Sequence, residues 1–167
     1  MRWRSVVIGG IASLTCLSAL VWKPQERLFW NRTESAPAGL YWLSDDPFTH
    51  GRWVVVSARS EAADWAQTHG LIGKDWPMIK QIAGVSGDEI CRHGTTISIN
   101  DIVVAKVLTA SHSGLKLPVW QGCQMLNDGE VFLLNSHPRS LDGRYFGVTK
   151  TSDLEGVAIL LFESRSE

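Results

Sequence analysis

The sequence has no acidic residue before Glu26 and no dense run of lysine or arginine. The missing basic run argues against a protein that follows a nucleic-acid backbone, because such proteins neutralise phosphates with clustered cations. The formal net charge of -1 over 167 residues points the same way, so we expect no nucleic-acid partner. A composition of 44% hydrophobic and 20% charged residues is typical of a globular protein with room for one domain.

Charge of either sign is also absent from residues 5–22, directly after Arg2 and Arg4. The apolar run 6–22 would be about 26 Å long as a helix, close to the ~30 Å of a bilayer core. We therefore predict that residues 1–22 form a cytoplasmic stub and an N-terminal transmembrane helix in the inner membrane, with everything downstream in the periplasm. A cleaved signal peptide is the alternative, although the run lacks a good small-x-small cleavage site.

Metal-binding motifs are missing as well, because the five histidines form no HExxH pattern and no zinc-type spacing with cysteine. We therefore expect no metal and no other cofactor. Of the three cysteines, Cys16 falls in the apolar run, which leaves Cys91 and Cys123 on the predicted periplasmic side. A disulfide between these two suits an oxidising compartment, and two unpaired buried thiols are the alternative.

Beyond a short connector at 23–32, the sequence has the pattern of β-structure. Short runs rich in Val, Ile, Leu and aromatic residues are bounded by turn sequences such as Ser86-Gly87-Asp88. These runs predict seven strands, at 39–43, 51–58, 77–83, 96–99, 102–107, 130–135 and 156–162. One short helix is predicted at 60–69, where the sequence closes on Gly70. We expect residues 33–167 to be one domain, mainly β, built as an antiparallel sandwich or partly open barrel.

Residues 33–36 place a serine among small residues, just before Pro37. In an extended chain the hydroxyls of Thr33 and Ser35 would point to the same side. Ser35 Oγ could then act as a nucleophile, while the Ser35 N–H and the Thr33 hydroxyl would form an oxyanion hole. An ordinary surface turn explains the same residues, and the GxSxG motif is absent.

A serine nucleophile needs a base, and no histidine stands in a recognisable triad context. Lys80 lies in the strand-like run 77–83, on the same face as Met78 and Ile82. Burial among these side chains would lower the lysine pKa and leave a neutral amine as general base. The alternative is a lysine on an edge strand that extends to water.

A polar loop with the sequence SLDGRYFG follows the predicted strand 130–135. Ser140, Asp142 and Arg144 stand two residues apart in it, so Asp142 and Arg144 could form an ion pair that fixes the loop. A fixed loop would present the Ser140 hydroxyl to Lys80 and orient the amine. The alternative is a surface loop whose ion pair contributes little stability.

The order of these segments resembles the signal peptidase I superfamily of Ser/Lys-dyad proteases. The apolar run is followed by the serine segment, then GRWVVVS, then the lysine segment KQIAGVSGDEI, and then SLDGRYFG. The resemblance implies Ser35 as the nucleophile, Lys80 as the general base and Thr33 as an oxyanion-hole donor. It also implies supporting roles for Ser140, Asp142 and Arg144.

Three departures from the superfamily pattern indicate one particular branch of the superfamily. Pro37 comes two residues after Ser35 instead of three. Ser86 stands where the lysine motif has proline, and Gly143 replaces the second serine of the loop. These features resemble the TraF branch of conjugative-transfer peptidases. That branch implies a membrane-anchored endopeptidase that processes the pilin precursor of a type IV secretion system, with or without cyclisation, beside the conjugative transfer machinery.

Other functions remain open at this point. The chain can be a general leader peptidase of the signal peptidase I type. A self-cleaving Ser/Lys regulator of the LexA type shares the dyad, but the apolar run and the lack of a DNA-binding domain argue against it. A non-catalytic β-domain of an envelope transfer complex is the third alternative, in which Ser35 and Lys80 have no chemical role.

Overall fold

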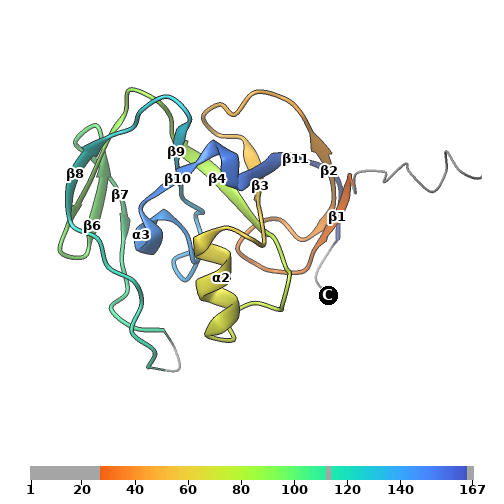
Figure 1. Cartoon of the computed structure of the whole chain (residues 1–167), viewed down its shortest axis with the longest axis horizontal. Coiled ribbons are helices and arrows are strands. Elements are labelled where there is room, and N and C mark those ends of the chain that lie inside the picture. The colour runs from red at the N-terminus through yellow and green to blue at the C-terminus, as the bar shows by residue number, and fades with distance from the viewer. Residues whose placement is uncertain (1–26, 112–113, 165–167) are drawn as a thin grey trace, which may run out of the picture.

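The computed structural model describes residues 27–111 and 114–164, so the predicted membrane segment 1–22 lies outside the described residues. Within those ranges the chain forms two antiparallel sheets, and no helix there is long and apolar enough to cross a membrane. Figure 1 shows the two sheets next to each other, with the one longer helix packed beside them. The prediction of a mainly antiparallel β-domain is confirmed.

The larger sheet carries the segments that were singled out from the sequence. In spatial order its strands are β1 (Leu28–Asn31), β2 (Gly39–Ser44), β11 (Leu154–Glu163), β3 (Trp53–Val56), β4 (Met78–Gly84), β9 (Glu130–Leu133) and β10 (Val148–Lys150). Strand β4, which contains Lys80, is therefore central, between β3 and β9. Hydrophobic clusters cover both faces of this sheet, with Met78 and Ile82 in one cluster and Ile79 in the other. Most residues of β4 are consequently buried, Lys80 among them.

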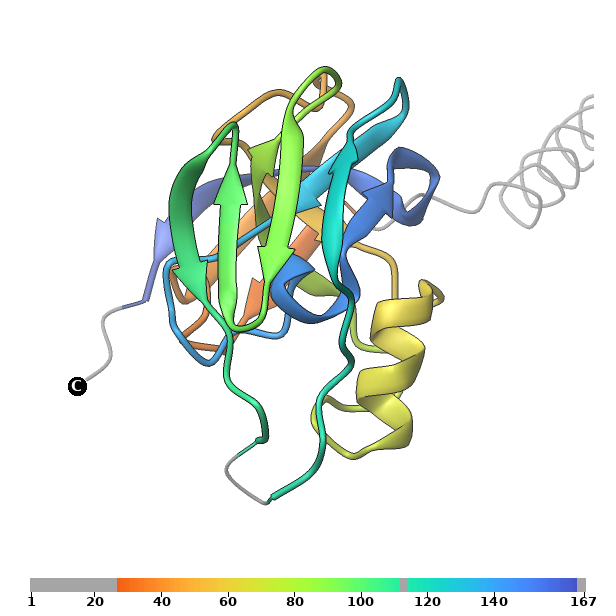
Figure 2. The same cartoon turned by 90° about the vertical axis from the view of Figure 1, so that its left-hand side faces the viewer.

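The smaller sheet has four strands. In spatial order they are β7 (Ile102–Lys106), β6 (Thr96–Ile99), β5 (Glu89–His93) and β8 (Gly122–Met125). Figure 2 shows this sheet face on. Ile90 and Ile97 of this sheet pack with Phe132 of β9 in a shared core, so the two sheets form one hydrophobic unit. Cys91 and Cys123 are directly paired positions on β5 and β8, and a disulfide joins them.

The predicted helix is confirmed as α2 (Glu61–Thr68). It begins at Ser60, whose side-chain oxygen accepts a hydrogen bond from the Ala63 N–H at 3.2 Å and so satisfies a free donor of the first turn. Ala63 and Ala66 face the core. Two shorter elements are helix α3 (Gly143–Phe146), which lies within the SLDGRYFG segment, and a 3-10 turn (Thr151–Asp153). Neither was predicted, because helices of this length carry no periodic pattern.

Four strands were missed in the sequence, and each has an evident reason. Strand β1 lies in the segment expected to be a connector, and β10 has only three residues. All four residues of β8 are exposed, so its pattern lacks the apolar alternation that marks a strand. Strand β5 contains a buried arginine, Arg92, where a hydrophobic residue would be expected.

Candidate active site

The serine segment folds as a turn over residues 34–36 and not as an extended chain. Asn31, at the end of β1, organises this turn from the inside. Its side-chain Nδ2 lies 3.1 Å from each of three carbonyl oxygens, those of Thr33, Ala36 and Pro37. The missed strand β1 thus holds the Ser35 segment in place, because it contributes the buried Asn31 amide around which the chain turns.

The turn nevertheless brings together the same two hydroxyls that an extended chain would have placed on one side. Thr33 Oγ1 lies 3.4 Å from Ser35 Oγ. Thr33 Oγ1 also donates to Asn31 Oδ1 at 2.8 Å, and the Thr33 N–H donates to the same oxygen at 3.0 Å. In this arrangement the Thr33 hydroxyl proton points to Asn31.

Lys80 is buried, with 5% of its surface exposed, so the alternative of an edge-strand lysine in water is wrong. Its Nζ donates to Ser140 Oγ at 3.1 Å, which is the contact expected from the sequence. Desolvation lowers the pKa of Lys80 from 10.5 to about 8. The Asp142 carboxylate opposes this fall, and the Arg144 guanidinium adds to it. The result is an amine that loses its proton far more readily than an ordinary lysine.

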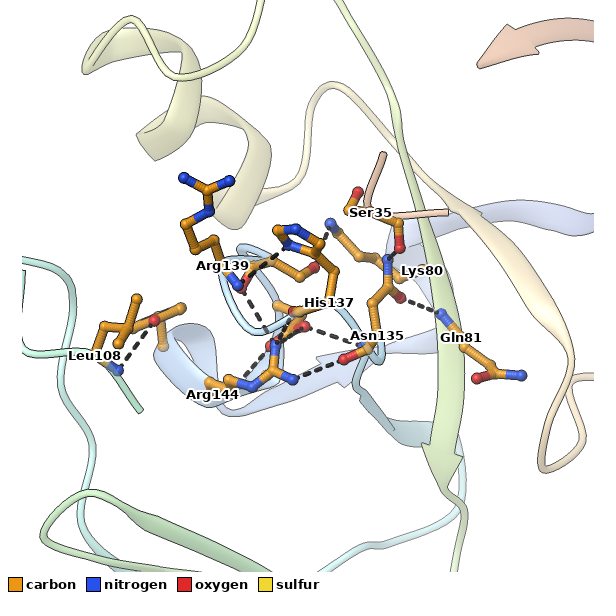
Figure 3. Close-up of polar contacts among 12 residues, drawn as sticks. Ser35, Lys80, Gln81, Leu108, Asn135, His137, Arg139 and Arg144 are labelled. Carbon is orange, nitrogen blue, oxygen red and sulfur yellow. Dashed lines mark hydrogen bonds and ion pairs between the residues drawn. The ribbon is translucent and has the colours of Figure 1, made fainter. Parts of the chain in front are cut away.

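Ser35 and Lys80 line the same cavity, of about 470 Å³. Figure 3 shows the Lys80 side chain extending between Ser35 and the loop that carries His137 and Arg139. No hydrogen bond joins Ser35 Oγ to Lys80 Nζ within the described part of the chain; the amine instead donates to Ser140. Catalytic contacts often tighten only when substrate binds, so the shared cavity is the relevant observation.

The 140–144 loop is buried, so the alternative of a surface loop is wrong. Arg144 Nη1 lies 2.7 Å from Asp142 Oδ2, and their side chains are only 4% and 0% exposed. Asp142 also caps helix α3 by accepting a hydrogen bond from the Arg144 N–H at 3.1 Å. Burial raises the pKa of Asp142, while Arg144 and two backbone N–H groups act in the opposite direction. This ion pair fixes the loop that presents Ser140.

Asn135 was not singled out from the sequence, yet it connects the segments that carry Ser35, Lys80 and Asp142. Its Nδ2 donates to the Ser35 carbonyl oxygen at 2.6 Å, and its Oδ1 accepts from the Gln81 N–H at 2.9 Å. Its own N–H donates to Asp142 Oδ2 at 3.1 Å. The signal in the sequence was an asparagine at the end of the apolar run VFLLN, because a buried amide requires partners on every side.

Gly143 has a steric explanation. A Cβ atom at this position would lie 2.6 Å from the Phe132 ring and 2.7 Å from the Leu133 carbonyl oxygen. A serine at position 143 would therefore collide with the core, which accounts for one of the departures noted in the sequence.

One group of described residues has its potential metal ligands close together, namely Cys91, His93 and Cys123, within 4.8 Å of one another. The disulfide engages both sulfur atoms, and His93 Nε2 lies 3.6 Å from Cys123 Sγ. The arrangement is thus a disulfide with a histidine beside it. Next to it, the buried Arg92 donates to the Arg144 carbonyl oxygen at 2.7 Å and so connects the smaller sheet to the 140–144 loop.

Comparison with known proteins gives this site a context. The family model of signal peptidase, peptidase S26, matches residues 1–163. A plasmid transfer protein TraF from Escherichia coli is 30% identical over 160 residues, which cover 89% of each chain. A second Escherichia coli TraF is 29% identical over 163 residues, covering 91% of this chain and 90% of that protein.

Among solved structures, a signal peptidase I from Enterococcus faecalis aligns with 68% of this chain and 98% of its own, at a TM-score of 0.39 and 19% identity. The family match over nearly the whole chain and the TraF relatives agree with each other. The chain therefore belongs to the signal peptidase family, peptidase S26, as a TraF-type member.

Proposed function

We propose that this protein is a serine endopeptidase in which Ser35 is the nucleophile and Lys80 the general base. The observation that carries the proposal is the state of Lys80: a buried amine with a pKa lowered to about 8, in the cavity that also contains Ser35. Burial of an ammonium is costly, so the Lys80 amine loses its proton readily; its hydrogen bond to Ser140 orients it, and the Asp142 carboxylate attracts its charged form.

In this mechanism neutral Lys80 takes the proton of the Ser35 hydroxyl as Oγ attacks the scissile carbonyl carbon. The tetrahedral intermediate collapses with cleavage of the C–N bond, and Lys80 gives its proton to the leaving amine. An acyl-enzyme on Ser35 remains. Water then attacks the ester and releases an acid, or an amino group of the substrate attacks it and forms a new peptide bond.

The oxyanion of the intermediate needs donors, and the Ser35 N–H and the Thr33 hydroxyl are the candidates. Thr33 has to rotate its hydroxyl proton away from Asn31 to serve. This rotation leaves Asn31 Oδ1 with the Thr33 N–H, at 3.0 Å, so no buried acceptor loses its last partner. The cost of the rotation is accordingly small.

The substrate we propose is a secreted or membrane precursor of a conjugative type IV secretion system, with the pilin precursor first. Support comes from the two TraF relatives, which are plasmid transfer proteins. The uncharged run at 5–22 supports a single-pass anchor in the inner membrane, with the peptidase domain in the periplasm. Location at the membrane would place the site where such precursors arrive.

The test is precursor processing in membranes that contain full-length wild type, Ser35→Ala or Lys80→Met and no other peptidase of this family. Both variants should leave the precursor uncut. Ser152→Ala and Lys150→Met, at exposed positions outside the cavity, are the matched controls and should process it normally. Normal processing by Ser35→Ala or Lys80→Met would refute the catalytic assignment.

A further inference from the structure

The charged side chains that line the active-site cavity are all cationic, within the described residues. Besides Lys80, its lining includes two exposed arginines, Arg32 and Arg139, and no acidic residue is found among the described residues that form it. Much of the remaining wall is apolar, with the large side chains of Trp30 and Trp76. The whole chain has a formal net charge of -1, so this concentration of positive charge is a local property of the cavity.

The two guanidinium groups are available to a ligand. Within the described part of the chain, neither forms an ion pair or a side-chain hydrogen bond, whereas Arg52 and Arg144 are each paired with an aspartate. Figure 3 shows Arg139 extending from the same loop that presents Ser140 to Lys80. Arginine in this state has five free N–H donors in a planar fork, the geometry that matches a carboxylate.

In the sequence these arginines are neighbours of two of the candidate site residues. Arg32 directly precedes Thr33 in the serine turn, and Arg139 directly precedes Ser140. A peptide bound over Ser35 in this cavity therefore passes within the field of two cations, one from each catalytic segment. The apolar walls lower the local dielectric beside the two arginines, so an ion pair formed there is stronger than one in open water.

We propose that Arg32 and Arg139 bind a carboxylate of the substrate near the scissile bond, and that the enzyme selects precursors that carry one. This inference rests on the proposed peptidase function. The carboxylate belongs either to an Asp or Glu side chain or to the free C-terminus of a precursor cut near its end. Two arginines suit this role better than Lys80, because a carboxylate paired with Lys80 would stabilise the ammonium and remove the base.

The first experiment determines which residues the enzyme prefers around the scissile bond, without assuming the sequence of the natural substrate. Full-length protein in mild detergent cleaves a diverse peptide library, and mass spectrometry identifies the cleaved bonds. From the best-cleaved peptide, a synthetic series then places Glu, Gln or Lys at each of the four positions on either side of the bond. A parallel pair carries a free C-terminal acid or an amide a few residues beyond the bond, which separates the two sources of the carboxylate.

For wild type we expect kcat/KM to be about fivefold higher for the Glu peptide than for the Gln peptide at one position or more, or for the free-acid peptide than for the amide peptide. This difference is the size expected for a partly exposed ion pair. Lys at the same position should be cleaved more slowly than Gln. Arg139→Glu and Arg32→Glu should each reverse the order, so that Lys is preferred over Glu. Arg59→Glu makes the same charge change at an exposed position outside the cavity, so this variant should cleave the Glu, Gln and Lys peptides in the same order of preference as wild type.

The outcomes separate this inference from the function on which it rests. If wild type cleaves no peptide and no precursor, the peptidase function fails. If it cleaves the Glu, Gln and Lys peptides at equal rates, or if both charge reversals keep the preference of wild type, peptidase activity stands and carboxylate selection is refuted. Added salt should weaken the preference for Glu while cleavage of the Gln peptide continues.

Discussion

Replacing Lys80 with methionine should abolish activity and at the same time stabilise the fold. The pKa of Lys80 is about 8 in the folded protein against 10.5 for an ordinary lysine, which at about 1.4 kcal/mol per pH unit is a cost of about 3 kcal/mol near pH 7. Methionine fills similar space without charge. It also forfeits the hydrogen bond to Ser140, which is worth about 1 kcal/mol, so we expect a net gain in unfolding free energy of about 2 kcal/mol.

The gain has a characteristic pH dependence. Because the folded pKa lies below the unfolded value, the unfolded wild type binds more protons between pH 8 and 10.5, and wild-type stability rises across that window. The Lys80→Met variant lacks this rise, so its advantage should be complete at pH 7 and disappear towards pH 10.5. Urea unfolding of full-length protein in mild detergent, followed by tryptophan fluorescence at pH 7 and pH 10, measures both quantities.

Two controls accompany this measurement. Lys150→Met removes an exposed lysine and should change stability little at either pH. The double variant Lys80→Met with Ser140→Ala removes both partners of the hydrogen bond and should gain more than Lys80→Met alone. A Lys80→Met variant that is no more stable than wild type at pH 7, or equally favoured at both pH values, would show that burial of the ammonium is not costly and would remove the main argument for a neutral base.

Three further predictions follow from the site. The kcat/KM of wild type should rise with pH and level off above about 8, because the base must be neutral; a plateau already reached below pH 6.5 contradicts Lys80 as that base. Asn135→Asp removes the donor that lies 2.6 Å from the Ser35 carbonyl oxygen and should lower kcat about 10- to 100-fold with a smaller effect on KM; an unchanged kcat would show that this contact does not position the nucleophile. Gly143→Ser should lower the unfolding free energy by about 1–3 kcal/mol in urea unfolding, because its Cβ meets the Phe132 ring at 2.6 Å; a fully stable variant means that the core can yield there.

Local patterns in the sequence were sufficient to predict much of the fold. The seven predicted strands correspond to β2, β3, β4, β6, β7, β9 and β11, since each has an apolar run bounded by turn residues. The strands that were missed lack such runs. Strand β8 is exposed along its whole length, and β1 has the composition of a connector, so only pairing with neighbouring strands defines them.

In the candidate site, too, residues that belong to a local sequence pattern could be predicted, whereas residues defined by contacts with distant segments could not. Ser35, Lys80, Ser140, Asp142 and Arg144 could be singled out as candidate site residues, because their types and order follow a family pattern. The roles of Asn31 and Asn135 could not be, since an asparagine has no local signature of the carbonyl groups that it will meet. Asn135 contacts Ser35, a hundred residues away in the chain, and no spacing rule reaches that far.

By itself, the sequence determined which side chains are present for chemistry and which runs of the chain form strands, because both depend on residue type and near neighbours. The tertiary structure alone decided that Lys80 lies on a central strand, where loss of hydration lowers its pKa to about 8. It also decided that the 140–144 loop is buried and that two unpaired arginines share the cavity of Ser35. Burial and desolvation depend on every segment that packs around a group, and those segments come together only in the folded chain.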